Sequence, residues 1–273
     1  MHNFVSFNHQ IISTENAFLS AISSAAFYGK GIFTTLAVYN LKPFLWEKHW
    51  ERLNENAGKL CIDLADYSEE SVKKSLLEII TENKIINGRV RITFFDESAS
   101  GVWNFDTNKK TSLLIATADL RNIYNSFRLA VSPFQVNSTS PLAGIKSCNY
   151  LENLLALENA KAENFDEAIR LNERGEVVSA CMANIFWIKN NCIFTSALET
   201  GCLKGTIRSF ILEKFPVEER RLDLSELLEA EDAFLTSSGL GVVKVQNINT
   251  VDFSDSSEIF SQVKSFFKDT VEK

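Results

Sequence analysis

Hydrophobic positions follow two different periods along this chain, and each period predicts a type of element. The stretch Phe4–Phe7 has an alternating pattern, and residues 32–39 are β-branched and aromatic, so both are expected to be strands. Residues 46–60 change to the helical period. A second helix is expected to begin at Ser68, because a serine can cap a helix and two glutamates follow it in the first turn.

The same patterns divide the chain into two expected domains. Strands at 89–95 and 111–118 complete an α+β unit, and the polar, aperiodic stretch 119–126 separates it from a new strand at 127–132. A long helix is expected at 149–164. The expected division is a small N-terminal α/β domain at 1–119, a linker at 120–126 and a larger C-terminal domain at 127–273. Later helices are expected near 204–214, 224–230 and 256–270, and later strands near 217–221, 232–237 and 242–248.

The composition is that of an ordinary globular protein, since 45% of the 273 residues are hydrophobic and 23% are charged. A net charge of −7, without a run of five like charges, argues against nucleic-acid binding. No basic residue precedes Lys30, no signal-peptide pattern is present, and apolar stretches such as residues 177–188 are too short to span a membrane. We therefore expect a cytoplasmic protein that binds neither nucleic acid nor a membrane.

Cysteines, histidines and glycines argue against several classes of site. The five cysteines have no Cys-x-x-Cys spacing and mostly lie in apolar runs, so they are expected to be buried free thiols. All three histidines precede residue 50, which makes a hydrolase triad or a zinc site a weak hypothesis. No glycine-rich nucleotide-binding motif occurs. An enzyme with this sequence must therefore hold any cofactor in another way.

The strongest local feature is a lysine, Lys146, in the sequence Leu-Ala-Gly-Ile-Lys-Ser-Cys-Asn-Tyr of residues 142–150. An apolar, glycine-containing approach precedes it, an uncharged helical turn follows it, and no acidic partner is near in sequence. Burial lowers the pKa of a lysine and turns it into an amine nucleophile that can form a Schiff base. The alternative is a lysine whose amine extends to the surface.

Six segments in order resemble the class IV pyridoxal-phosphate enzymes of fold type IV, which include branched-chain aminotransferases, D-amino-acid aminotransferases and 4-amino-4-deoxychorismate lyases. They cover most of the chain. The resemblance implies a two-domain α/β fold with a barrel-like sheet in the larger domain, pyridoxal 5′-phosphate in the cleft between the domains, and a homodimer. The segments are Tyr28–Thr35, His49–Leu53, the Gly-Ile-Lys-Ser-Cys-Asn sequence around Lys146, Leu171–Gly175, Ala183–Phe186 and Thr200–Arg208.

The resemblance also implies roles for individual residues. Lys146 would bind the cofactor as a Schiff base and then move the substrate proton. Arg52 would hold the cofactor phosphate, unless it is a surface arginine that pairs with a neighbouring glutamate. Tyr150 would contact the ring oxygen of the cofactor, unless it only packs at the start of a helix.

Three further residues are implied at the phosphate. The backbone N–H groups of Thr206 and Ile207 would bind it, because they follow Gly205 at the start of an expected helix and a helix N-terminus binds anions. Ser238 would add a hydroxyl. The alternative for Ser238 is an ordinary turn residue after a strand.

Two features favour the lyases within this family. Most relatives carry a glutamate that forms a salt bridge with the protonated ring nitrogen, and Ser179 occupies that position here. A serine can form a hydrogen bond with the nitrogen but cannot balance a positive charge, so transfer of the amino group should suffer more than elimination. The triplet Phe33-Thr34-Thr35 also resembles the lyases, and Thr35 would place a hydroxyl near the reacting carbons. Its alternative role is only to favour the strand.

Two departures from the family pattern concern the substrate carboxylate. Lys30 replaces the usual acidic residue of a glycine-rich turn, and Asp96 stands where many relatives carry an arginine that helps to bind this carboxylate. Arg91, Lys30 or a residue of a partner chain would then bind it.

Three hypotheses follow for a small amino substrate. The favoured one is a 4-amino-4-deoxychorismate lyase that releases pyruvate and 4-aminobenzoate in folate synthesis. The second is a branched-chain or D-amino-acid aminotransferase of the same fold. The third is a catalytically weakened relative that still binds pyridoxal phosphate or has lost it.

Overall fold

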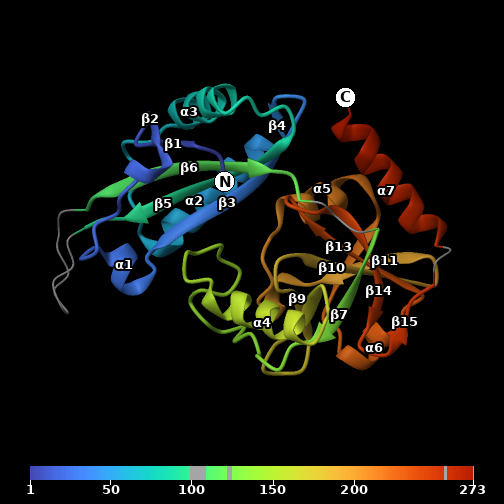
Figure 1. The fold of residues 1–273 in the computed structure, drawn as a ribbon. Helices are drawn as coiled ribbons and strands as arrows, with labels where there is room; N and C mark the ends of the chain where they lie inside the picture. The colour runs from blue at the N-terminus through green and yellow to red at the C-terminus, as the bar shows by residue number, and fades with distance from the viewer. Residues whose placement is uncertain (99–108, 122–124, 255–256, 273) are drawn as a thin grey trace. The chain divides into compact units, whose positions relative to one another are not determined.

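The computed structural model describes residues 1–98, 109–121, 125–254 and 257–272, and it confirms the predicted mixed α/β class. The chain divides into two compact units. Figure 1 colours the ribbon by residue number, from blue at the N-terminus to red at the C-terminus. The first unit contains Met1–Leu120 and Ile145–Asn149, and the second contains Arg121–Gly144 and Tyr150–Lys273. Ile145–Asn149 thus belong with the first unit, although they follow the expected linker by some twenty residues.

A six-stranded sheet with the order β2-β1-β6-β5-β3-β4 forms the centre of the first unit. Its strands pair antiparallel throughout. The elements are β1 (Phe4–Phe7), β2 (Gln10–Ser13), a short 3-10 turn (Thr14–Asn16), α1 (Ser24–Tyr28), β3 (Gly31–Tyr39), β4 (Lys42–Pro43), α2 (Trp46–Leu60), α3 (Glu69–Glu82), β5 (Gly88–Asp96) and β6 (Thr111–Asp119).

One face of this sheet forms the hydrophobic core. Even-numbered residues of β3, such as Ile32 and Leu36, pack with Leu53 of α2 and with Leu76 and Ile79 of α3. Because side chains alternate along a strand, the odd-numbered residues of β3 lie on the other face. That second face carries several of the candidate site residues.

The predicted helix boundaries agree closely with the structure because their local signals are strong. The helical pattern of residues 46–60 corresponds to α2, and the Ser68 side chain accepts a hydrogen bond from Ser71 N at the start of α3. Four short elements, β2, α1, β4 and β15 (Val251–Asp252), were not predicted. They have two to five residues each, too few for a period to be recognised.

The segment Ile145–Asn149 pairs with the beginning of β3. Phe33 N donates to Lys146 O at 2.9 Å, and Cys148 N donates to Gly31 O at 2.8 Å. The approach requires glycine at position 31, since a Cβ there would lie 2.9 Å from Cys148 Sγ and from Phe94 O. These contacts hold Lys146 against β3.

The second unit contains a nine-stranded sheet with the order β12-β11-β10-β13-β14-β7-β8-β9, to which β15 adds at β14. It forms the half-barrel that the fold class predicted. Its elements are β7 (Ser126–Val131), α4 (Leu151–Ala162), β8 (Glu167–Leu171), β9 (Val177–Ala180), β10 (Asn184–Lys189), β11 (Cys192–Ser196), a short 3-10 turn (Leu198–Thr200), α5 (Thr206–Lys214), β12 (Val217–Arg220), α6 (Leu224–Leu228), β13 (Asp232–Ser237), β14 (Gly241–Ile248), β15 and α7 (Glu258–Val271).

The two faces of β8 and β9 pack against different groups. Ile169 and Ala180 are paired across the strands and belong to the large core of this unit. Ala168 lies on the other face, where it packs with Ala156 and Ala160 of α4. The helix α4 therefore covers the face of the sheet on which the neighbouring pair, Arg170 and Ser179, also lies.

All five cysteines are free, as predicted, but the expectation that they are buried was wrong for Cys61 and Cys192, which are exposed, and Cys148 is only partly buried. Cys61 follows the last turn of α2 and Cys192 begins β11 after a turn, so both lie at element ends, where chain is exposed. Within the described residues, no helix combines the length and the apolar character that a membrane crossing requires.

Candidate active site

Lys146 lies beside an aromatic ring on the open face of the first sheet. Its Nζ is 4.5 Å from the centroid of the Phe33 ring, and the guanidinium carbon of Arg91 is 3.6 Å from the same centroid. Thr35 is the direct cross-strand partner of Arg91, so the two side chains share a face. Lys146 and Arg91 therefore share the Phe33 ring, and Thr35, the other predicted catalytic residue, is the cross-strand neighbour of Arg91.

The environment of Lys146 favours the neutral amine. Desolvation is the main reason that its pKa falls to about 7, and the positive charges of Arg52 and Arg91 lower it further. Near neutral pH a large fraction of the amine is then unprotonated. Such an amine can attack an aldehyde carbon, which an ordinary surface lysine does poorly.

Arg52 is buried under the core face of the same sheet, with only 7% of its surface exposed. Its Nη2 donates to Thr34 Oγ1 at 2.6 Å, and the same hydroxyl lies 2.6 Å from His49 Nδ1. A guanidinium can only donate, so the Thr34 hydroxyl accepts from Arg52, and the direction of its hydrogen bond with Nδ1 follows the tautomer of His49. Burial lowers the pKa of His49, and the charges of Arg52 and Lys146 add to this effect.

The two departures from the family pattern form an ion pair with one another. Lys30 Nζ lies 2.7 Å from Asp96 Oδ2, and the aspartate side chain is nearly buried. Burial alone would raise the pKa of Asp96, but hydrogen bonds from Lys30 and Ser98 outweigh it and lower that pKa. Lys30 is thus engaged by a carboxylate of its own unit, which leaves Arg91 as the better candidate for a substrate carboxylate.

In the second unit, the N-terminus of α5 forms a polar corner. Thr206 Oγ1 and Ser238 Oγ are 2.9 Å apart, and Ile207 is buried directly after Thr206. The N-cap residue is Gly205, where a Cβ would lie 2.0 Å from Asn184 Oδ1. Two hydroxyls beside the first-turn N–H groups of a nine-residue helix suit a phosphate dianion.

Ser179 lies on β9, directly across from Arg170 on β8. Arg170 is 2% exposed, and its Nη1 donates to Asn153 Oδ1 of α4 at 2.5 Å. Its Nη2 donates to Gln135 O at 3.1 Å and more weakly to Phe134 O at 3.4 Å.

The first turn of α4 closes over the end of β9. The Tyr150 hydroxyl donates to Cys181 O at 3.4 Å, and Asn153 Nδ2 donates to the same oxygen at 3.0 Å. The buried Glu167 carboxylate accepts hydrogen bonds from Cys181 N and Met182 N at 3.0 and 3.1 Å. The predicted residues Tyr150 and Ser179 therefore lie in one polar region of the second unit, around β9 and α4.

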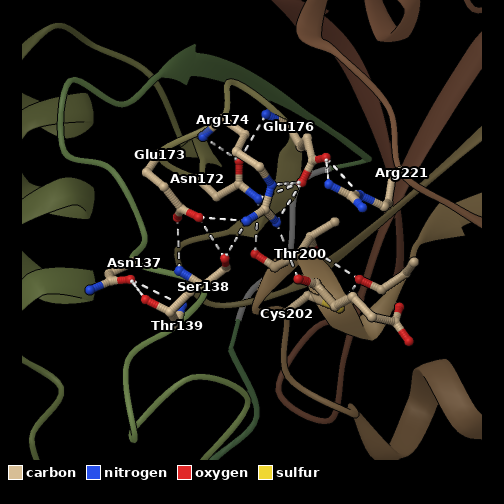
Figure 2. Close-up of polar contacts among 12 residues, drawn as sticks. Asn137, Ser138, Thr139, Asn172, Glu173, Arg174, Glu176, Thr200, Cys202 and Arg221 are labelled. Atoms are coloured by element: carbon tan, nitrogen blue, oxygen red, sulfur yellow. Dashed lines mark hydrogen bonds and ion pairs between the residues drawn. The ribbon is translucent and has the colours of Figure 1, made fainter.

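A network of charged side chains closes the turn between β8 and β9 (Figure 2). The Glu176 carboxylate accepts hydrogen bonds from Arg174, Asn172 and Arg221 at 2.7–3.0 Å. The hydrogen bond from Arg174 is the main cause of a Glu176 pKa of about 2. Glu173 extends the network to the Ser138 hydroxyl at 2.7 Å. Beyond this turn the register shifts by one residue between Leu171 and Arg170, and this shift places Ser179 opposite Arg170.

Two groups of this region were missed by the sequence reasoning. Arg170 and Asn153 have no role in the motifs, yet they are the polar residues closest to the Ser179 strand pair. A signal was available, because Arg170 is the one charged residue within the otherwise apolar stretch 168–171. The relay from Arg52 through Thr34 to His49 had no such signal, since it depends on the packing of α2 against β3.

Comparison with known proteins identifies the family of this chain. Residues 31–248 match the model of the amino-transferase class IV family. The chain is 28% identical to the aminodeoxychorismate lyase of Bacillus subtilis, over 96% of this chain and 92% of that protein. It is 27% identical to a D-alanine aminotransferase of Listeria monocytogenes, over 97% and 94%. A branched-chain aminotransferase structure from Thermoproteus uzoniensis superposes with a TM-score of 0.91 at 23% identity, over 100% and 95% of the two chains.

The family match covers most of the chain, and it confirms the resemblance found in the sequence. It also confirms the expectation of an enzyme, a transaminase or lyase whose cofactor is pyridoxal 5′-phosphate. The residues present fit this cofactor, since a lysine of lowered pKa suits its aldehyde and the α5 corner suits its phosphate. This chain belongs to the amino-transferase class IV family.

Proposed function

We propose that this protein is a 4-amino-4-deoxychorismate lyase that releases pyruvate and 4-aminobenzoate. The observation that carries the proposal is the pair of Ser179 and Arg170, which puts a hydroxyl and a positive charge, in place of the family's glutamate, at the position expected for the cofactor ring nitrogen. The bound cofactor supplies an electron-withdrawing ring to the carbon that carries the substrate amine. A ring without a paired carboxylate withdraws less strongly, which disfavours full amino transfer.

Lys146 is assigned to the aldehyde of the cofactor and to the proton transfer. Elimination requires a base that removes the proton from the carbon bearing the amino group, while the enolpyruvyl oxygen leaves from the neighbouring carbon. A pKa near 7 allows one amine both to accept this proton and to return it. Thr35, on the same face as Arg91, is assigned to the reacting carbons.

The phosphate and ring contacts are proposed for each unit by itself. In the first unit, the guanidinium of Arg52 binds phosphate, held in one orientation by Thr34. In the second unit, the N–H groups of Thr206 and Ile207 and the Ser238 hydroxyl bind phosphate. Tyr150 contacts the ring oxygen, and Arg91 binds a substrate carboxylate.

The second candidate function is an amino-acid aminotransferase of branched-chain or D-amino-acid type. It is favoured by the D-alanine aminotransferase of Listeria monocytogenes, which is as similar to this chain as the lyase of Bacillus subtilis is, within one per cent identity. Lys146 and Arg91 would serve either reaction. The two candidates differ in whether an amino acid alone converts the cofactor to its amine form.

The experiment that separates them is a visible absorption spectrum of the protein with pyridoxal phosphate, before and after excess amino acid, together with Lys146→Ala. A band that depends on Lys146, persists with amino acids and accompanies 4-aminobenzoate release from 4-amino-4-deoxychorismate supports the lyase. Rapid conversion to the amine form of the cofactor supports the aminotransferase. Absence of any band supports the weakened relative.

We also propose a homodimer that works in the cytoplasm, in folate synthesis. The dimer is supported by large apolar side chains exposed in each unit, among them Phe18 and Ile22 in the first and Leu151, Leu154 and Leu155 of α4 in the second. Light scattering of the purified protein should give twice the chain mass of 30.7 kDa. A single-chain mass at micromolar concentration would contradict the dimer.

A further inference from the structure

Arg170 is a buried cation whose place in the fold is not explained by the family motifs. It lies on the α4 face of β8, and its cross-strand partner is Ser179. We propose that Arg170 holds a permanent positive charge at the ring-nitrogen end of the cofactor, so that the nitrogen stays unprotonated and accepts a hydrogen bond from Ser179. This inference rests on the proposed function, because it assumes that Ser179 faces the ring nitrogen.

The partners of Arg170 leave its charge largely unbalanced. Asn153 Oδ1, Gln135 O and Phe134 O are neutral acceptors. Glu152 forms an ion pair with Arg170 at 3.5 Å, but the Glu152 side chain is 79% exposed and therefore well screened by water. The buried Glu167 carboxylate of the same region is bound by Cys181 N and Met182 N. A guanidinium does not lose its proton in a protein. The region thus contains a fixed positive charge that would repel a second one on a pyridine nitrogen.

Arg170 also has an unused donor. Its Nε is buried and has no hydrogen-bond partner among the residues that the structure describes. A buried donor without a partner is costly, and a bound acceptor removes that cost. The Ser179 hydroxyl lies on the same face, across from Arg170, and it can donate as well. Both groups therefore favour a hydrogen-bond acceptor beside them. An unprotonated ring nitrogen can accept a hydrogen bond, whereas a protonated one cannot.

The surroundings hold Arg170 in place. On one side Asn153 of α4 binds the guanidinium, and Asn153 is itself tied to Cys181 O. On the other side the charged turn of Figure 2 fixes the β8–β9 hairpin through Glu176. The contacts of the guanidinium with Asn153 Oδ1 and Gln135 O hold its charge in place when a cofactor binds.

The consequence concerns the outcome of the reaction. An unprotonated ring nitrogen stabilises negative charge on the substrate carbon less than a protonated one does. Loss of a leaving group from the neighbouring carbon relieves this charge at once, whereas amino transfer must keep it long enough for a proton to return elsewhere. Arg170 therefore favours elimination, and it acts as a positioning residue through the cofactor nitrogen.

The first test is ¹⁵N NMR of pyridoxal phosphate labelled at the ring nitrogen and bound to the protein at pH 7. We expect the shift of an unprotonated pyridine in the unchanged protein, and a change toward the protonated value in the double variant Arg170→Met/Ser179→Glu. Arg170→Lys should keep the unprotonated shift because it keeps the charge. The matched control is Arg128→Met on the adjacent strand β7, which removes an exposed arginine and should leave the shift unchanged.

The second test uses the unchanged protein, so that it does not depend on the folding of a variant. The affinity for pyridoxal phosphate is compared with that for its analogue in which a C–H group replaces the ring nitrogen. A hydrogen bond from the neutral Ser179 hydroxyl predicts about twofold to tenfold weaker binding of the analogue. Equal affinities, or a protonated nitrogen in the unchanged protein, would overturn the proposal.

Failure of this inference differs from failure of the proposed function. If Lys146→Ala abolishes the cofactor band but the nitrogen is protonated, the enzyme assignment stands and the role of Arg170 is wrong. If the nitrogen is unprotonated but amino acids convert the cofactor rapidly, the role of Arg170 stands and the lyase assignment is wrong.

Discussion

The hydroxyl of Thr34 joins Arg52 to His49, with both contacts at 2.6 Å. The hydroxyl accepts from Arg52 and is also hydrogen-bonded to the His49 ring, so each of the three groups fixes the orientation of the next. The relay is buried, so the loss of its central hydroxyl leaves a guanidinium and an imidazole without this partner.

Thr34→Val should therefore weaken pyridoxal phosphate binding by about tenfold, which corresponds to about 1.4 kcal/mol. Thr34→Ser keeps the hydroxyl and should bind the cofactor nearly as well as the unchanged protein. The measurement is a titration of apoprotein with the cofactor, followed by absorbance. Equal losses in both variants would show that the methyl group, and not the hydroxyl, is what matters.

The pKa of Lys146 predicts how cofactor capture depends on pH. Only the neutral amine attacks, so the rate at which apoprotein captures pyridoxal phosphate should rise with pH, reach half its maximum near pH 7, and then level off. Arg91→Met removes a nearby positive charge and should move this midpoint to higher pH. Stopped-flow absorbance measures both profiles. A midpoint near pH 10 in the unchanged protein would contradict the lowered pKa.

The same pKa predicts that stability depends on pH. A lysine whose pKa is lower in the folded chain than in the unfolded chain binds fewer protons when folded. Between about pH 7 and the ordinary value of 10.5, its contribution to the free energy of unfolding should therefore increase with pH. Lys146→Met should remove this increase, as urea unfolding at pH 7 and pH 9.5 would show.

Glu176 should stabilise the β8–β9 turn in a way that acid removes. Its pKa is lowered from 4.5 to about 2, so its contribution is complete above about pH 4.5 and is lost as the pH falls toward 2. Glu176→Gln should lower the free energy of unfolding at pH 7 by about 1–2 kcal/mol, because charge-assisted hydrogen bonds are replaced by neutral ones. Urea unfolding should show that this difference shrinks between pH 4.5 and pH 2. A constant difference would mean that the charge of Glu176 has no part in it.

Substitution of Gly205 at the start of α5 can be compared with a matched control, substitution of Gly58 inside α2. Gly205→Ala places a Cβ 2.0 Å from Asn184 Oδ1, while Asn184 is held by Leu203 O, so the change should cost about 1–3 kcal/mol through steric overlap. Gly58 lies inside α2 with no atom within 4 Å of an added Cβ, and Gly58→Ala should stabilise the chain by about 0.5–1 kcal/mol. Thermal unfolding compares the two. A neutral Gly205→Ala would show that Asn184 is free to move.

Much of the fold follows from local pattern. The period of residues 46–60 and the cap at Ser68 predict α2 and α3, because helix periodicity and capping depend on residues only three or four positions apart. The reactive character of Lys146 was also predicted. Its apolar neighbours in the sequence indicate burial, and burial makes the positive charge of a lysine costly. Short elements lack that information. The strand β2, for example, forms because it pairs with β1.

The pairing of distant residues depends on the tertiary structure. In the sequence Lys30 and Asp96 are two unrelated departures from a family pattern, but the register of β3 and β5 brings them together as one ion pair. Ser179 likewise indicates only a lost carboxylate, whereas the β8–β9 register shows a buried arginine across from it. Sequence pattern predicts which residues are reactive and which elements they form. Register and burial decide which charges meet, because a shift of one residue along a strand turns each side chain to the opposite face.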